Sequence, residues 1–122
     1  QKFAIKGVLF YQGINNCVAG QARPNLYMET FPALIPDWRK AFGDPEMPFC
    51  VVQMTSFGPP DDENEPEMNM LHRASGVREA QLKAHLKHPH TGIVATYDLG
   101  HVQMHSPFKR PIGERAARWA LD

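Results

Sequence analysis

Two short polar segments hold the residues best suited to chemistry, and the first is Gln12-Gly13-Ile14-Asn15-Asn16. A glycine next to carboxamide side chains supplies neutral N–H donors that can be aimed at a developing oxyanion. Asparagine also tolerates left-handed backbone conformations, so turn formation is the commoner role for such a pair. The segment is therefore a candidate oxyanion site, with a simple turn as the alternative.

The second segment is a polar loop over residues 98–108 that contains His101 and His105. Imidazole titrates near neutral pH, so a histidine in such a loop suits a general base, although most loop histidines are only solvated. The two histidines could bind a metal if helical, but the zincin pattern with its glutamate is missing, and we expect no metal. His85, His88 and His90 lie among lysines and indicate a solvated helix end.

The elements that must position these segments follow from hydropathy. Three apolar runs that end at turn or polar residues predict buried strands over residues 3–11, 49–54 and 91–97. Apolar residues at helical spacing predict helices that begin near Pro32 and end at Gly43, and that cover residues 70–86 and 109–121. Pro36 predicts a kink or a late start in the first of them.

Strands that alternate with helices predict βαβ units and a mostly parallel sheet. Three strands are few for a sheet, so the chain is expected to form part of one. Ligands of such sheets bind outside the carboxyl ends of the strands. Residues 12–16, 55–56 and 98–107 follow the three strands, so we expect them to meet at one edge.

Composition excludes some classes of function. The 122 residues carry thirteen basic and thirteen acidic side chains, which argues against a nucleic-acid-binding module. We expect no membrane span and see no signal peptide, because no apolar run approaches the ~20 residues that cross a bilayer. Cys17 and Cys50 lack metal-type spacing, and free thiols are favoured over a disulfide. Residues 58–67 are acidic and proline-rich, which predicts an exposed loop rather than a calcium site.

Taken in order, these segments resemble sialate O-acetylesterases, the carbohydrate-esterase branch of the SGNH hydrolases. Residues 6–16 (KGVLFYQGINN) are similar to that family's KGVLWYQGESN block. Residues 31–43, 48–53, 78–81 and 98–121 resemble its F..LI.DWR..FG, PF..VQ, REAQ and DLG…IHP..K..VGERLA.WAL blocks. The resemblance implies a three-layer α/β/α flavodoxin-like fold with a mostly parallel sheet. Residues 1–122 would be the C-terminal part of a single SGNH-type esterase domain.

The resemblance also implies an activity, the hydrolysis of acetyl esters on sugars by a serine nucleophile without a metal or organic cofactor. An acetylated carbohydrate would be the substrate, and the family habit implies a secreted or periplasmic enzyme. Position by position, the motifs imply His105 as catalytic base, Asn16 and Gly13 as oxyanion-hole donors, and Gln12, Glu79 and Gln81 as substrate-binding residues that shape the pocket.

One departure from the family pattern concerns the nucleophile. The family's Gly-x-Ser block is not present, and Ser56, Ser75 and Ser106 stand in other contexts. The remaining N-terminal part of the same domain is therefore the partner expected to supply the serine. A non-catalytic carbohydrate-binding or interaction domain, derived from the esterase fold, is the alternative.

Further departures from the family pattern lie near His105 and the pocket. SGNH enzymes commonly place Asp three residues before the histidine, where this chain has Val102. Asp98 is the nearest carboxylate, so either Asp98 or a backbone carbonyl would orient His105. Ile14 stands where the family has Glu, which removes a charge near the pocket, and Ser106 interrupts the family's His-Pro pair.

Overall fold

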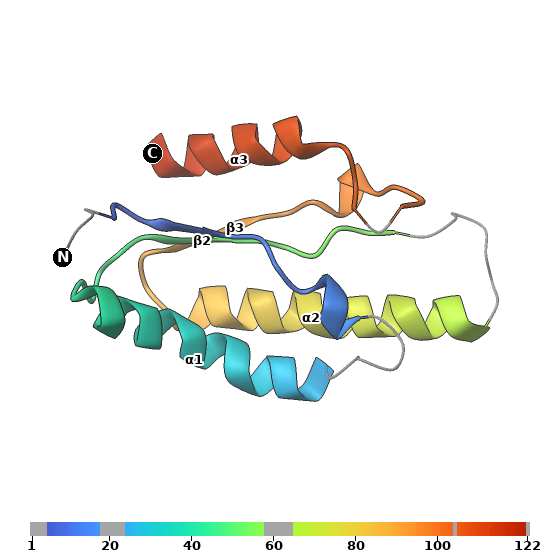
Figure 1. The fold of residues 1–122 in the computed structure, drawn as a ribbon, viewed down its shortest axis with the longest axis horizontal. Helices are drawn as coiled ribbons and strands as arrows, with labels where there is room; N and C mark the ends of the chain where they lie inside the picture. Colours follow the sequence, from blue (N-terminus) through green and yellow to red (C-terminus); the bar gives the residue numbers. More distant parts are fainter. Residues whose placement is uncertain (1–4, 18–23, 58–64, 104, 122) are drawn as a thin grey trace.

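The computed structural model describes residues 5–17, 24–57, 65–103 and 105–121 (Figure 1). Its elements follow one another in the order β1 (Val8–Phe10), η1 (Ile14–Asn16), α1 (Pro24–Phe42), β2 (Phe49–Val52), α2 (Glu65–Lys87), β3 (Thr91–Val94), η2 (Tyr97–Leu99) and α3 (Lys109–Leu121). This alternation of strands and helices confirms the α/β class predicted from the sequence.

The three strands form a parallel sheet in the order β1-β2-β3. Cys50 of β2 pairs with Leu9 on one side and with Gly92 on the other. Helices α1 and α2 cover one face of the sheet and α3 covers the other (Figure 1). All four residues of β2 are buried because this strand has neighbours at both edges and helices on both faces. The layered, parallel architecture is therefore confirmed.

Side chains of β2 alternate between two apolar clusters, as successive strand residues must. Phe49 and Val51 pack toward α1 and α2, in a cluster that also includes Phe31 and Ile35. Cys50 and Val52 pack under α3 in the second cluster, which also holds residues 94, 112 and 116. Burial raises the pKa of the Cys50 thiol to about 11, so the thiol stays protonated. Cys50 is a free cysteine, and the Cys17 thiol donates to the Gly13 carbonyl at 3.5 Å.

Helix α1 corrects one boundary, since it begins at Pro24 and runs through Pro32 and Pro36. Pro36 has no N–H, so it leaves the carbonyl of Pro32 without its intrahelical donor. Nε2 of His88 donates to that carbonyl at 2.8 Å. The break in the helix ladder is thus repaired from α2, by a contact between residues 56 positions apart.

Other expectations change in detail. The third strand ends at Val94 rather than 97, and the polar loop opens with the 3-10 turn η2. Helix α2 begins at residue 65 rather than 70. The histidines near its end are not merely solvated, because His85 Nδ1 lies 3.0 Å from Thr91 Oγ1 and His88 binds α1. The predicted acidic loop falls largely outside the described residues. Of the helices described, none is long and apolar enough to cross a membrane.

Gly92 allows α3 to approach β3 closely. A Cβ built at this position would lie 2.1 Å from Cε2 of Trp119, a distance that no real contact permits. The missing side chain therefore leaves the room in which the indole ring lies against the sheet.

We expect Gly92→Ala to lower the free energy of unfolding by about 1–3 kcal/mol, because overpacking forces the Trp119 ring away from its site. Urea denaturation followed by tryptophan fluorescence measures this change. Combining Gly92→Ala with Trp119→Leu should recover part of the loss, since the smaller side chain makes room. If Gly92→Ala lowers the free energy of unfolding equally in wild type and in the Trp119→Leu variant, the steric explanation is wrong.

Candidate active site at the carboxyl edge of the sheet

A pocket of about 230 Å³ opens at the edge of the sheet where the parallel strands end. It is lined by Tyr11, Gln12, Gly13, Ile14, Asn15, Met54, Thr55, His105 and Lys109. These residues follow β1 and β2 or lie at the start of α3. The two polar segments singled out by the sequence therefore meet at one site, although 92 positions separate Gly13 from His105.

The segment after β1 turns sharply into η1 at Gly13. Its backbone has φ 143°, a conformation that side chains with a Cβ rarely adopt. A Cβ there would also come within 2.9 Å of Cγ1 of Val77 on α2. Gly13 is thus required both by backbone conformation and by close packing, and the turn it makes brings residues 14 and 15 to the pocket.

Gln81 of α2 supports this turn from below. Its side chain is fully buried, and its Oε1 accepts from the Met54 N–H at 2.8 Å. Its Nε2 lies 3.1 Å from the Gln12 carbonyl and 3.3 Å from the Tyr27 hydroxyl. One carboxamide therefore joins the ends of β1 and β2 to α1. Gln81, predicted as a substrate-binding residue, is not among the residues that line the pocket and supports the turn from the interior.

The buried phenol of Tyr27 takes part in the same network. Desolvation raises its pKa to about 12, although the hydrogen bond from Gln81 acts in the opposite direction. Tyr27 is consequently a protonated donor, and its hydroxyl lies 3.4 Å from the Gln12 carbonyl. That carbonyl is held by two donors from two helices.

Asn16 lies beside the pocket and is linked to it through Gln12. Nε2 of Gln12 donates to Oδ1 of Asn16 at 3.2 Å. The backbone N–H of Asn16 donates to the Gly13 carbonyl at 3.0 Å, which closes the 3-10 turn. Asn15 lines the pocket directly. The segment therefore forms a turn that places Asn15 at the pocket and Asn16 beside it.

A directed chain of hydroxyl groups forms the opposite wall. Each hydroxyl has one proton to donate, and that of Thr96 goes to the Gln53 carbonyl at 2.6 Å. Thr55 must then donate to Thr96 at 3.0 Å, and Tyr11 to Thr55 at 3.1 Å. The ammonium of Lys109 completes the chain, 3.4 Å from the Tyr11 hydroxyl and 4.7 Å from its ring centroid. Sequence reasoning had not assigned this wall.

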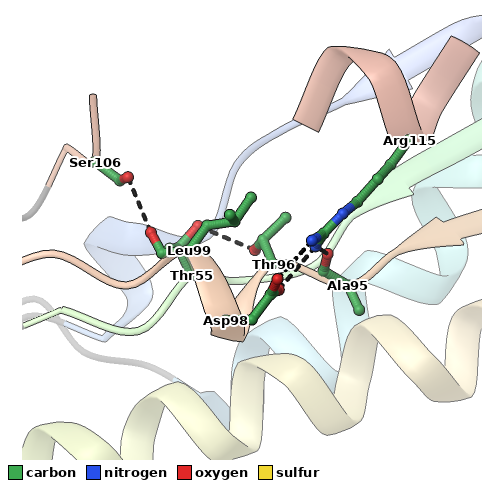
Figure 2. Close-up of polar contacts among 7 residues, drawn as sticks. All are labelled: Thr55, Ala95, Thr96, Asp98, Leu99, Ser106 and Arg115. Atoms are coloured by element: carbon green, nitrogen blue, oxygen red, sulfur yellow. Dashed lines mark hydrogen bonds and ion pairs between the residues drawn. The ribbon is translucent and has the colours of Figure 1, made fainter. Parts of the chain in front are cut away.

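His105 stands in the loop between η2 and α3, and its side chain is exposed at the pocket. The next residue, Ser106, is buried, and its hydroxyl donates to the Leu99 carbonyl at 3.0 Å (Figure 2). The same oxygen accepts from the Phe108 N–H at 3.2 Å, just before α3 begins. Ser106 therefore fixes both sides of the loop next to the histidine.

Asp98 does not orient His105 directly in the described part of the chain. Both of its carboxylate oxygens accept from the Arg115 guanidinium, at 2.7 and 2.5 Å (Figure 2). Arg115 also donates to the Ala95 carbonyl at 2.6 Å. The hydrogen bond from Arg115 holds the pKa of Asp98 below its ordinary value. Asp98 thus ties the start of the loop to α3.

The remaining expected residues lie elsewhere. Glu79 is exposed on α2, does not line the pocket, and pairs with Lys83 at 3.1 Å. His101 Nδ1 accepts from the Gln103 N–H at 3.0 Å, and of the two loop histidines only His105 is among the described residues that line the pocket. Within the described ranges, no three His, Cys, Asp or Glu side chains are grouped to hold a metal ion.

A parallel α/β sheet with a pocket at its carboxyl edge is typical of ligand-binding and catalytic domains, and comparison with known proteins identifies the family. The family profile described as "Carbohydrate esterase, sialic acid-specific acetylesterase" matches residues 1–121. The chain therefore belongs to this family of carbohydrate esterases. The resemblance found in the sequence motifs is confirmed.

Individual relatives agree with the family. Sialate O-acetylesterases of Homo sapiens and Pongo abelii are each 44% identical over 59 residues, which cover 43% of this chain and 11% of theirs. The crystal structure of a carbohydrate acetylesterase from Xanthomonas citri superposes with a TM-score of 0.76 at 35% identity. That alignment covers 94% of this chain and 25% of the bacterial one. The chain thus spans only a fraction of the relatives it matches.

The ion pair between Asp98 and Arg115 makes a testable electrostatic prediction. In wild type the Asp98 carboxyl should titrate with a pKa below its ordinary value, and Arg115→Met should raise that pKa toward the ordinary value of an aspartate. NMR titration of the carboxyl carbon measures both midpoints. The stabilisation is present above the unfolded-state pKa and is lost as pH falls through the lower folded-state value. Arg110→Met, which removes an arginine paired with Glu114, should leave the midpoint unchanged.

Proposed function

We propose that this chain supplies the base and the oxyanion donors of a carbohydrate O-acetylesterase that works by a serine–histidine mechanism. The observation that carries the proposal is the convergence of Gly13 and His105 on one pocket, with Asn16 beside it. A neutral donor group facing a histidine is the arrangement that acyl transfer requires. Membership of the carbohydrate esterase family supports an acetylated sugar as substrate.

In the first half-reaction, a serine Oγ bonds to the acetyl carbonyl carbon while its proton passes to Nε2 of His105. The carbonyl oxygen becomes an oxyanion, which the Asn16 side chain and the Gly13 N–H stabilise. The bond to the sugar oxygen then breaks, and that oxygen takes the proton from His105. The sugar leaves with a free hydroxyl, and the acetyl group remains on the serine.

In the second half-reaction, water adds to the acetyl carbon and gives a proton to His105. The oxyanion forms again, the serine oxygen leaves and recovers the proton, and acetate is released. His105 needs access to substrate and solvent for these transfers, and its exposed side chain at the pocket supports this. Since Asp98 is paired with Arg115, we assign it to holding the loop rather than to the imidazole.

We place the nucleophile on a further segment of the same domain, docked beside β1. Within the described residues β1 pairs with β2 alone, and Leu9 is 56% exposed. A groove of about 700 Å³ runs between β1 and the small residues of α3, including Gly113 and Ala117. A strand added to β1 would bring its own carboxyl end to the pocket edge, because parallel strands end on the same side.

Among the described residues that line this pocket, Lys109 carries the one fixed charge, and none is a carboxylate. Ile14 adds an apolar contact in place of the acid that its relatives carry at this position. The pocket is therefore suited to an O-acetylated sugar that is neutral or anionic. By family likeness, we also propose that the complete protein acts outside the cytoplasm.

His105→Ala in the complete enzyme tests the proposal. Loss of the general base should lower turnover of an O-acetylated sugar by at least about 10³-fold, while the circular dichroism spectrum stays unchanged. Acetate release measures the turnover. Near-normal turnover would show that His105 is not the base, and sugar binding without hydrolysis in wild type would favour a binding domain instead.

Asn16→Ala tests the oxyanion donor separately. Removing one donor of this type should reduce kcat by about 10²–10³-fold with little change in KM, because the oxyanion exists only after attack. Steady-state kinetics of acetate release give both constants. A reduction of less than threefold would assign Asn16 to the turn alone.

A further inference from the structure

Gln12 connects the pocket to the candidate donor Asn16 through two different groups. Its side-chain Nε2 donates to Oδ1 of Asn16 at 3.2 Å. Its main-chain carbonyl is held by Gln81 at 3.1 Å and by Tyr27 at 3.4 Å. The backbone of Gln12 is thus fixed by the interior, while its side chain is exposed and lies against a neighbour four residues later.

The bond from Gln12 determines which end of the Asn16 carboxamide remains for a ligand. A carboxamide has one acceptor oxygen and one donor NH₂ group. Because Oδ1 accepts from Gln12, the NH₂ group is left, and within the described residues it donates to no other side chain. An oxyanion needs a donor, so this orientation is the productive one.

The network beneath Gln12 fixes the backbone from which its side chain reaches Asn16. Gln81 is fully buried and joins the ends of β1 and β2, so its carboxamide cannot turn without losing a bond. Tyr27 is buried as well and stays protonated, so it keeps donating to the Gln12 carbonyl. The Gln12 side chain can therefore move only by rotation about its own bonds, because its backbone is held in place.

We propose that Gln12 is a positioning residue that presents the N–H donors of Asn16 to the oxyanion. This inference rests on the esterase function proposed above. It replaces the expectation that Gln12 binds substrate, and the two roles differ in kinetics. A substrate contact acts on KM, whereas an aligned oxyanion donor acts on kcat.

Two variants of the complete enzyme separate these roles. Gln12→Met keeps the length of the side chain but loses the donor, and should lower kcat about 5–20-fold with KM unchanged within about twofold. Gln12→Glu presents an acceptor, which should draw the Asn16 N–H groups to itself and lower kcat about 10²-fold. Acetate release from an O-acetylated sugar, with p-nitrophenyl acetate as a second ester, measures both constants.

The decisive measurement is a double-mutant cycle. If Gln12 acts through Asn16, then Gln12→Met should change kcat less than twofold in the Asn16→Ala background. Gln53→Met is the matched control, because the Gln53 amide donates only to the Arg78 carbonyl in the described structure and does not line the pocket. Its kcat should stay within about twofold of wild type, and thermal unfolding confirms that the Gln12 variants fold.

The kinetic results distinguish the proposed esterase function from the positioning role of Gln12. A wild-type enzyme that releases no acetate, or an Asn16→Ala variant with full kcat, would overturn the oxyanion assignment and this inference with it. If Asn16→Ala is impaired but Gln12→Met costs the same in both backgrounds, or raises only KM, then Gln12 contacts substrate and the positioning role is wrong.

Discussion

A single buried carboxamide, that of Gln81, is the interaction on which the geometry of the pocket depends. It accepts from the main chain at the end of β2 and donates to the main chain at the end of β1. Both strands stop forming sheet hydrogen bonds at this edge, so their last polar groups need partners from elsewhere. Because one side chain satisfies both, the two strand ends are held in a fixed relation, and the residues that follow them form one wall.

The loop that carries His105 is held differently, by a set of polar contacts that ties it to the sheet and to α3. Ser106 binds the loop to its own start at Leu99, and Arg115 binds Asp98 and the end of β3 (Figure 2). His105 stands next to Ser106, so its backbone is fixed while its side chain remains free to face the pocket. A general base that must accept and return a proton benefits from this combination of a fixed backbone and an exposed ring.

In the described part of the chain, the arrangement of the helices leaves β1 uncovered on one face of the sheet. Helices α1 and α2 lie on one face of the sheet, whereas α3 lies on the other, where it packs against residues of β2 and β3 (Figure 1). The apolar side chain of Leu9 and the groove beside α3 are left uncovered within the described residues. An edge strand with an apolar, uncovered face is stable only when another element pairs with it. The proposed segment that carries the nucleophile would both pair with β1 and complete the site.

The sequence by itself determined the class of fold and the segments of the site, because apolar runs and helical spacing report local burial directly. It also singled out Gly13 and His105, which both line the pocket, because each stands in a motif of adjacent residues. It misplaced the start of α1, since the cost of Pro36 is offset by His88 from another helix, and no local pattern contains that contact. The pairing of Asp98 with Arg115 and the interior position of Gln81 were likewise decided only by tertiary structure. Hydrogen bonds between residues 17 to 69 positions apart arise from packing, which local sequence preferences do not encode.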